Sequence, residues 1–82
     1  MDTADQELLS KCEYLGKISL YTNTRGISEY DPSFYNLYVR KIFDKYYFYV
    51  SYRDKMLPVF DANSGPYIEY KDEILLFNMP EL

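Results

Sequence analysis

The chain has 82 residues, a formal net charge of −4 and one cysteine, Cys12, which predicts one domain, residues 1–82, without an internal disulfide. It has no histidine, the commonest general base and metal ligand, and no phosphate-binding glycine pattern, so we expect no enzymatic activity, no cofactor and no metal. No stretch approaches the roughly 20 apolar residues that span a bilayer, so we expect no membrane association and a cytoplasmic location.

Residues 3–15 are predicted to form a helix. Thr3 can cap it, and Gln6 follows at the spacing of a capping box. The apolar residues of this segment fall on one stripe, and they are Leu8, Leu9, Cys12 and Leu15. Gly16 is a natural helix stop. We interpret Cys12 as a packing residue of this stripe.

A short strand is expected next, over residues 17–22, with Ile18 and Leu20 on one side. Residues 23–33 contain the turn formers Gly26 and Asp31-Pro32. This segment is therefore predicted to be a loop.

Three segments between Phe34 and Phe60 predict an antiparallel meander. A two-residue loop at Asp44-Lys45 aligns one apolar face, with Phe43 opposite Tyr46, Lys41 opposite Phe48, Val39 opposite Val50, and Leu37 opposite Tyr52. The alternate residues form a mixed face, in the pairs Ile42 with Tyr47, Arg40 with Tyr49, Tyr38 with Ser51, and Asn36 with Arg53.

A second loop at Asp54-Lys55 adds the third segment to the same apolar face. It places Leu57 opposite Tyr52 and Val59 opposite Val50. A slip of one residue would mix the two faces, which is the argument for this alignment. Pro58 has no amide donor, so it belongs at a sheet edge or a bulge.

The strongest turn cluster is residues 61–66, where the chain must reverse or change layer. Residues 67–70 and 73–77 then predict a last hairpin across Lys71-Asp72, with Tyr67 opposite Leu76 and Ile68 opposite Leu75. A short helix starting near Asp72 is the alternative, because acidic residues suit a helix N-terminus.

Together these elements predict an α+β fold, with one N-terminal helix packed on a four- to five-stranded antiparallel sheet. The narrow apolar stripe of the helix can cover only one face of that sheet. The mixed face with Tyr38, Arg40, Tyr47 and Tyr49 is therefore a candidate for exposure or for burial by a partner. The alternative is that these tyrosines fill half-buried positions of a small sheet.

The chain has eleven tyrosines and no tryptophan. Tyrosine and arginine are enriched at protein–protein hot spots, so the mixed face suits a protein partner. The segment Lys45-Tyr-Tyr-Phe-Tyr-Val-Ser-Tyr52 resembles the octamer of the RNA-recognition motif, but Tyr46 and Phe48 stand where that motif has small residues. We interpret the segment as a tyrosine-rich strand.

The leading hypothesis is a non-catalytic small acidic protein that binds and blocks a larger protein. Phages and mobile elements encode compact acidic inhibitors of nucleases and defence complexes, of the anti-CRISPR and anti-restriction types. The partner would be a nucleic-acid-binding protein, and acidic side chains would occupy its phosphate positions. The expected partner-binding residues are Tyr38, Arg40, Tyr47, Tyr49, Arg53, Asp61, Glu69, Asp72 and Glu73.

Two alternatives come from other classes. The first is a single-stranded nucleic-acid-binding module that stacks bases on Tyr47 and Tyr49 beside Arg40 and Arg53. The acidic total charge opposes this mode of direct nucleic-acid binding. The second is a self-associating subunit, such as a homodimer, that pairs through the tyrosine face or the edge at Pro58.

Overall fold

The computed structural model describes residues 1–24, 27–63 and 65–77, with side chains except those of residues 20–34 and 73. The predicted α+β class, an N-terminal helix on an antiparallel sheet, is confirmed. The described part contains seven strands in place of the expected four or five. The elements are α1 (Thr3–Ser10), β1 (Glu13–Thr24), β2 (Ile27–Ile42), β3 (Lys45–Tyr52), β4 (Lys55–Pro58), β5 (Phe60–Ala62), β6 (Gly65–Tyr70) and β7 (Glu73–Phe77).

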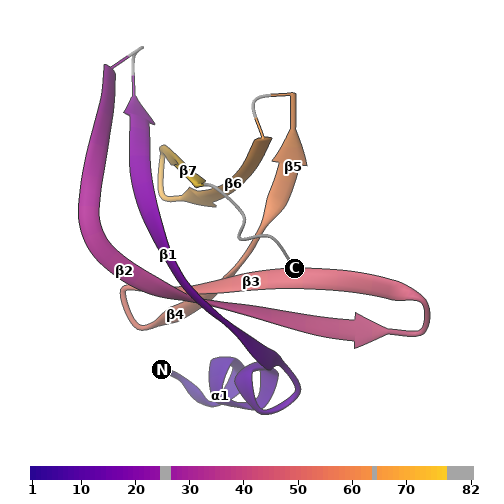
Figure 1. Cartoon of the computed structure of the whole chain (residues 1–82). Helices are drawn as coiled ribbons and strands as arrows, with labels where there is room; N and C mark the ends of the chain where they lie inside the picture. The colour runs from indigo at the N-terminus through magenta and orange to yellow at the C-terminus, as the bar shows by residue number, and fades with distance from the viewer. Residues whose placement is uncertain (25–26, 64, 78–82) are drawn as a thin grey trace.

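The strands form one sheet in the order β4-β3-β2-β1-β7-β6-β5. Its two parts, β1–β4 and β5–β7, are joined by a short antiparallel pairing of residues 20–22 of β1 with residues 75–77 of β7. The sheet curls, so that β4 also contacts β6 although four strands lie between them in the order of the sheet. Figure 1 shows the resulting shape, in which β6 and β7 lie above β3 and β4.

The meander of β2, β3 and β4 is confirmed, but both predicted turns are wrong by one residue. The loops lie at Phe43-Asp44 and Arg53-Asp54, so Val50 pairs with Leu37 and with Leu57. Arg53 and Asp54 both have positive φ, 48° and 62°, as in a type I′ turn. Aspartate tolerates this conformation, whereas lysine continues into the next strand. The pairing of β3 with β2 and that of β3 with β4 each move by two residues from the predicted register. Because side chains alternate with a period of two, the same residues still share each predicted face.

The predicted helix is too long at its C-terminal end. It stops at Ser10, and Asp2 caps it by accepting a 2.9 Å hydrogen bond from the Asp5 amide in place of Thr3. Residues 13–24 form β1 instead, and Gly16 lies at a register shift of this strand with φ of 140°. Such a φ is open to glycine at little cost, so Gly16 forms a bulge where the sequence predicted a helix stop.

The loop predicted over residues 23–33 is also wrong, because β1 and β2 form a long hairpin there. Their pairing continues to Thr24 and Ile27, and Gly26 lies outside the described residues. The register shifts between the pairs Ser19–Phe34 and Leu20–Asp31. Pro32 falls in this irregularity, where a missing amide donor is tolerated.

The last hairpin is confirmed as β6–β7, with Tyr67 opposite Leu76 and Ile68 opposite Leu75, so the helical alternative is wrong. The chain reverses in the segment 61–66, between Ala62 and Gly65, as predicted. Pro58 lies in β4, at one edge of the sheet, which confirms the expectation for a strand proline.

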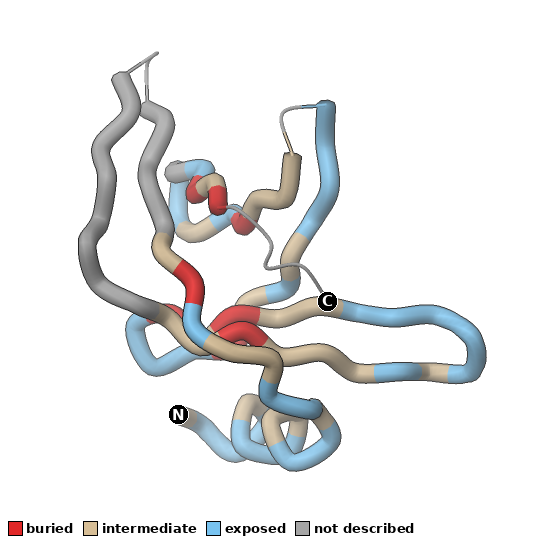
Figure 2. The backbone as a smooth tube through the Cα atoms, in the orientation of Figure 1, coloured by how far each residue is buried: buried red, intermediate tan, exposed pale blue. Residues whose placement is uncertain are grey.

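The core lies inside the curl of the sheet (Figure 2). Its buried members from β1–β3 are Ile18, Leu37, Val50 and Tyr52, and those from β6 and β7 are Ile68, Leu75 and Phe77. Leu57 and Val59 pack against this cluster. The part of the predicted apolar face around Leu37, Val50 and Tyr52 is therefore buried under the second part of the same sheet, whereas its other end, at Phe43 and Tyr46, is exposed.

The helix α1 packs on the mixed face, contrary to the assumption that it would cover the apolar face. It contacts β4, where Met56 is buried although it points away from the core residue Leu57. Figure 1 shows α1 on the side of β2–β4 opposite to β6 and β7. The helix consequently covers part of the mixed face, near β4.

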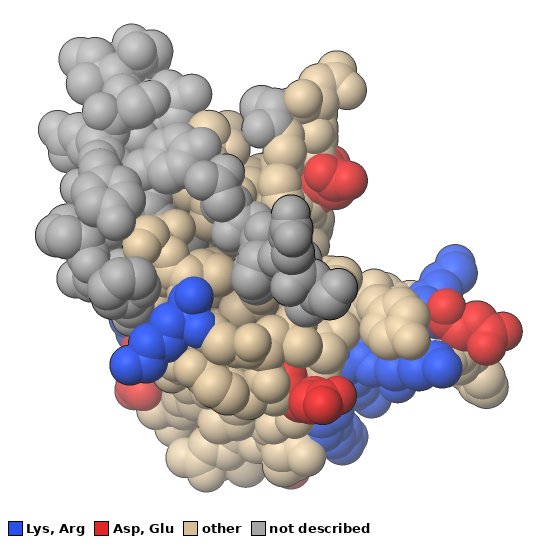
Figure 3. Space-filling view, viewed as in Figure 1, with Lys and Arg blue, Asp and Glu red and all other residues tan. Residues whose placement is uncertain are grey.

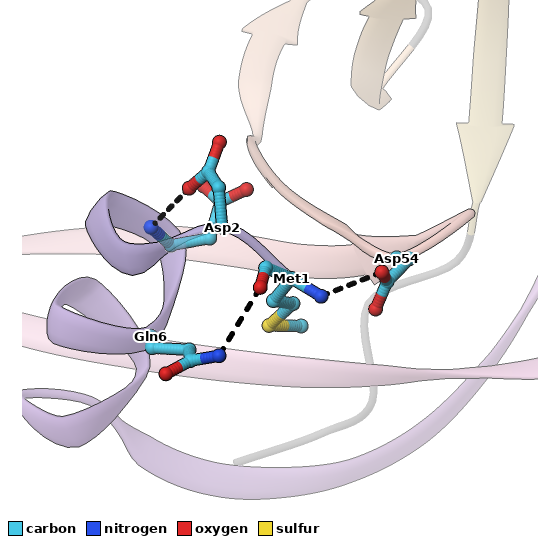
Figure 4. A network of polar contacts seen from close by, with 5 residues as sticks. Met1, Asp2, Gln6 and Asp54 are labelled. Atoms are coloured by element: carbon cyan, nitrogen blue, oxygen red, sulfur yellow. Dashed lines mark hydrogen bonds and ion pairs between the residues drawn. The ribbon is translucent and has the colours of Figure 1, made fainter.

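A small polar network joins the start of α1 to the β3–β4 turn (Figure 4). The Met1 ammonium group donates to the Asp54 carboxylate, and Gln6 Nε2 donates to the Met1 carbonyl at 3.1 Å. The Asp54 side chain is 79% exposed, so this ion pair contributes little to stability. The packing of α1 on β4, where Met56 is buried, holds the helix in addition to this ion pair.

Candidate functional site

The β2–β3 hairpin projects from the body of the molecule (Figure 1). It carries exposed aromatic side chains. Phe43 is 93% exposed at its tip, and Tyr46 and Tyr47 follow on β3 at 60% and 41%. Exposure of apolar surface to water is unfavourable unless a partner covers it. The sequence pattern predicts Phe43 on the apolar face, so Phe43 is not among the expected site residues.

Phe43 also has an unusual backbone conformation. Its φ is 55°, in the left-handed region that is costly for residues with a bulky side chain. Glycine or asparagine would suit this turn position better. A strained and fully exposed phenylalanine contributes nothing to the fold that we can identify, which makes it a candidate contact residue.

We expect Phe43→Gly to stabilise the folded protein by about 1 kcal/mol, because glycine adopts positive φ without the steric cost. The lost side chain packs against almost nothing, so little burial is given up. Chemical denaturation followed by circular dichroism measures the change. The matched control is Tyr46→Gly in β3, where glycine should destabilise by about 0.5–1 kcal/mol. Destabilisation by Phe43→Gly would contradict the strained conformation.

A groove of about 540 Å³ lies at the base of the hairpin, beside the edge of β3. β4 pairs with Tyr49–Tyr52 only, so in the described structure no strand pairs with the first residues of β3 on this side. The described residues that line the groove are Tyr46, Tyr47, Phe48, Tyr49, Pro58, Val59, Phe60, Asp61 and Pro66. Its size falls within the usual range for binding pockets, about 300–1,000 Å³.

The structure brings four of the predicted site residues together on β2 and β3. Tyr38 pairs with Tyr49, and Arg40 pairs with Tyr47, so the four side chains share one face. Tyr38, Arg40 and Tyr49 are half-buried, while Tyr47 is exposed. The ring of Tyr38 also contacts Tyr14 of β1, with 5.6 Å between centroids.

Arg53 lies apart from this group, at the β3–β4 turn. Its guanidinium stacks over the rings of Tyr52 and Tyr70, at 5.1 and 5.6 Å from their centroids. These contacts are cation–π interactions at the margin of the core. Arg53 thus has a structural contact that the sequence analysis did not foresee.

The predicted acidic residues are not gathered on one face. Asp61 pairs with Pro66, and Glu69 lies three positions farther along β6, so their side chains point to opposite sides of the sheet. Asp72 is exposed in the β6–β7 turn. The Glu73 backbone pairs with Tyr70, and its side chain lies outside the described set. Of the acids whose side chains the structure describes, Asp61 alone lines the groove.

Basic side chains accompany the exposed aromatics of the hairpin (Figure 3). Residues 36–53 contain Arg40, Lys41, Lys45 and Arg53 against the single acid Asp44, although the whole chain carries −4. The Lys41 ammonium lies 5.5 Å from the centroid of the Tyr46 ring. The hairpin is therefore a locally basic, aromatic projection of an acidic protein.

Cys12 lies in the connection between α1 and β1 rather than on the helix. Its thiol is free and half-buried. Burial raises the pKa of the Cys12 thiol above its ordinary value, and the positive charge of Arg40 opposes part of that rise. The thiolate, which is the reactive form, is therefore disfavoured at neutral pH.

No protein-family model, curated protein or solved structure that was compared with the chain matches it. Within the described ranges, no three histidine, cysteine or acidic residues lie close enough to hold a metal ion. The helix in that part of the chain is too short to cross a membrane.

Proposed function

We propose that the protein is a non-catalytic binding protein that occupies a surface of a larger protein through its β2–β3 hairpin. The observation that carries the proposal is the exposure of Phe43, Tyr46 and Tyr47 on one projecting element. Large aromatic side chains that become desolvated supply much of the energy of protein–protein binding. Arg40, half-buried beside Tyr47, adds a second residue type that is frequent at hot spots.

The fuller form of the proposal makes the protein an inhibitor. Its partner is then a nuclease or another nucleic-acid-binding component of a host defence complex, and the protein itself is a product of a phage or mobile element. The small size and acidic charge of the chain support this form. Because the acids are spread over both sides of the sheet, the hairpin rather than an acidic surface would make the main contact.

The test compares what tagged variants retain from a nuclease-treated lysate of the native host. We expect Phe43→Gly combined with Tyr47→Ser to weaken binding of the partner at least about 30-fold, since each hot-spot aromatic contributes about 2 kcal/mol or more. Ile74→Ser on β7 is the matched control, because Ile74 is also exposed, at 46%, but lies on another hairpin.

Equal retention by the double variant and the wild type would contradict the proposal. Once the partner is identified, the proposal that this protein is an inhibitor is tested by measuring the partner's activity with increasing amounts of this protein. Unchanged partner activity at saturation would leave a binding protein that does not inhibit.

The basic character of the hairpin favours one second candidate, a single-stranded nucleic-acid-binding module. Tyr47 and Tyr49 would stack bases beside Arg40, which pairs with Tyr47, whereas Arg53 lies apart at the β3–β4 turn; stacking contributes about 1–3 kcal/mol per base. Titration of a labelled oligonucleotide at low salt tests it. Tight binding that weakens steeply with salt would place this candidate first.

A further inference from the structure

We propose that the groove beside the hairpin binds a proline-rich segment of the partner, in the polyproline II conformation, that carries one basic residue. This inference rests on the proposed function, because it names the chemistry of the partner that the groove accepts. It concerns the groove at the base of the hairpin and not the exposed tip at Phe43.

The lining of the groove matches this ligand in shape and chemistry. Aromatic residues of β3, among them Tyr47 and Tyr49, line it together with Phe60 and Pro66 of the β5–β6 hairpin. The Phe60 ring contacts the Tyr67 ring, with 5.6 Å between their centroids. Aromatic-lined grooves of this kind accept the pyrrolidine rings of a polyproline II helix. Such a ligand is already extended when free, so little conformational entropy is lost on binding.

The tyrosines also offer the hydrogen bonds that this ligand requires. A polyproline II segment has no internal hydrogen bonds, and its carbonyl groups are free to accept. Tyr46 and Tyr47 are 60% and 41% exposed, and each hydroxyl is a donor. Side-chain donors at the groove wall can therefore pair with the carbonyls of the ligand.

A β-strand fits the groove less well than a polyproline II segment. Strand addition needs a regular row of backbone donors and acceptors on the receiving edge. Here Pro58 and Pro66 have no amide hydrogen, and the Phe48 carbonyl already accepts a 2.8 Å hydrogen bond from the Val59 amide. Recognition in this groove must therefore come mainly from side chains.

The carboxylate of Asp61 gives the groove a preference for a positively charged ligand. Asp61 is exposed, and it is the one charged residue that lines the groove in the described structure. A carboxylate at the edge of an aromatic groove favours an arginine or lysine in the ligand and disfavours an acidic residue.

The test is a titration of the purified full chain with a synthetic labelled peptide that is proline-rich and contains one arginine, followed by fluorescence anisotropy. We expect saturable binding, a loss of about tenfold or more for Tyr47→Ala, and about fivefold for Asp61→Asn. Asp72→Asn is the matched control, because it removes the same charge from an exposed turn outside the groove. A peptide with alanine in place of proline should bind at least about tenfold more weakly, because it does not prefer the bound conformation.

The Asp61→Asn effect should disappear when the arginine of the peptide is replaced by alanine. Absence of saturable binding, equal binding of the alanine peptide, or equal losses for Asp61→Asn and Asp72→Asn would each overturn the inference. If the peptide fails while the lysate partner still depends on Phe43, only this inference is overturned and the proposed function stands. Binding of an oligonucleotide that depends on Tyr47 but not on Asp61 would also overturn it.

Discussion

Leu37→Ala should remove most of the stability of this protein. Leu37 is fully buried in β2, where β2 pairs with both β1 and β3, and it belongs to the core cluster. Leucine-to-alanine changes at such sites cost about 2–5 kcal/mol, through lost burial and the cavity left behind. A domain of this size has a free energy of unfolding near the low end of about 5–15 kcal/mol. Urea denaturation followed by circular dichroism measures the loss.

The control for this change is Ile74→Ala, which truncates an aliphatic side chain that is 46% exposed on β7. We expect a loss of about 1 kcal/mol or less there, since less area is removed from a packed environment. Similar losses for both variants would contradict the position of the core inside the curled sheet.

Tyr52→Ala should destabilise the protein by about 3–5 kcal/mol, because Tyr52 joins the two parts of the sheet. The centroid of its ring lies 5.0 Å from that of Tyr35 in β2 and 5.0 Å from that of Tyr70 in β6. The contact with Tyr70 is edge-to-face. The strands β3 and β6 are not neighbours in the sheet, so the Tyr52–Tyr70 contact helps to close the curl. Thermal and urea unfolding both report this loss.

Tyr52→Phe is the matched control, because it keeps the ring and removes only the hydroxyl. It should cost about 1 kcal/mol or less. A double-mutant cycle with Tyr70→Ala should give a coupling energy of about 0.5–1.5 kcal/mol. Additive losses would show that the two rings do not support each other in solution.

The meander and the last hairpin could be predicted because strand side chains alternate with a period of two. The turns were placed one residue too late, since Asp44 and Asp54 were taken as the first rather than the second loop residue. The assignment of residues to the two faces stayed correct, because moving a two-residue turn by one position changes the register by two. The faces of Leu37, Val50 and Leu57 were therefore correct despite the wrong pairs.

The N-terminal half was predicted less well because local signals there compete. The stripe through Leu15 is compatible with a helix, but Leu15 gains partly buried contacts with the core when residues 13–24 form a strand. Gly16 and Pro32 look like breaks in the sequence, and the long β1–β2 hairpin accommodates both at register shifts. Pairing between distant residues overrode these local preferences.

The candidate site was found in part. The grouping of Tyr38, Arg40, Tyr47 and Tyr49 follows from alternation alone, and the structure places these residues on one face. Phe43 was missed, although the turn-forming Asp44 beside it was a usable signal. The groove could not be predicted, because Phe60 and Asp61 approach β3 only through the course of the chain after β4.

The sequence by itself determined the alternation of the strand faces, the restriction of Pro58 to an edge or a bulge, and the hairpin pairing of Tyr67 with Leu76. These follow from periodicity and from proline's missing donor. Only the tertiary structure decided that β6 and β7 cover the apolar face, that α1 lies on the mixed face near Met56, and that Phe43 stands exposed. The physical reason is that burial depends on which surfaces meet, and the curl of the whole sheet decides this.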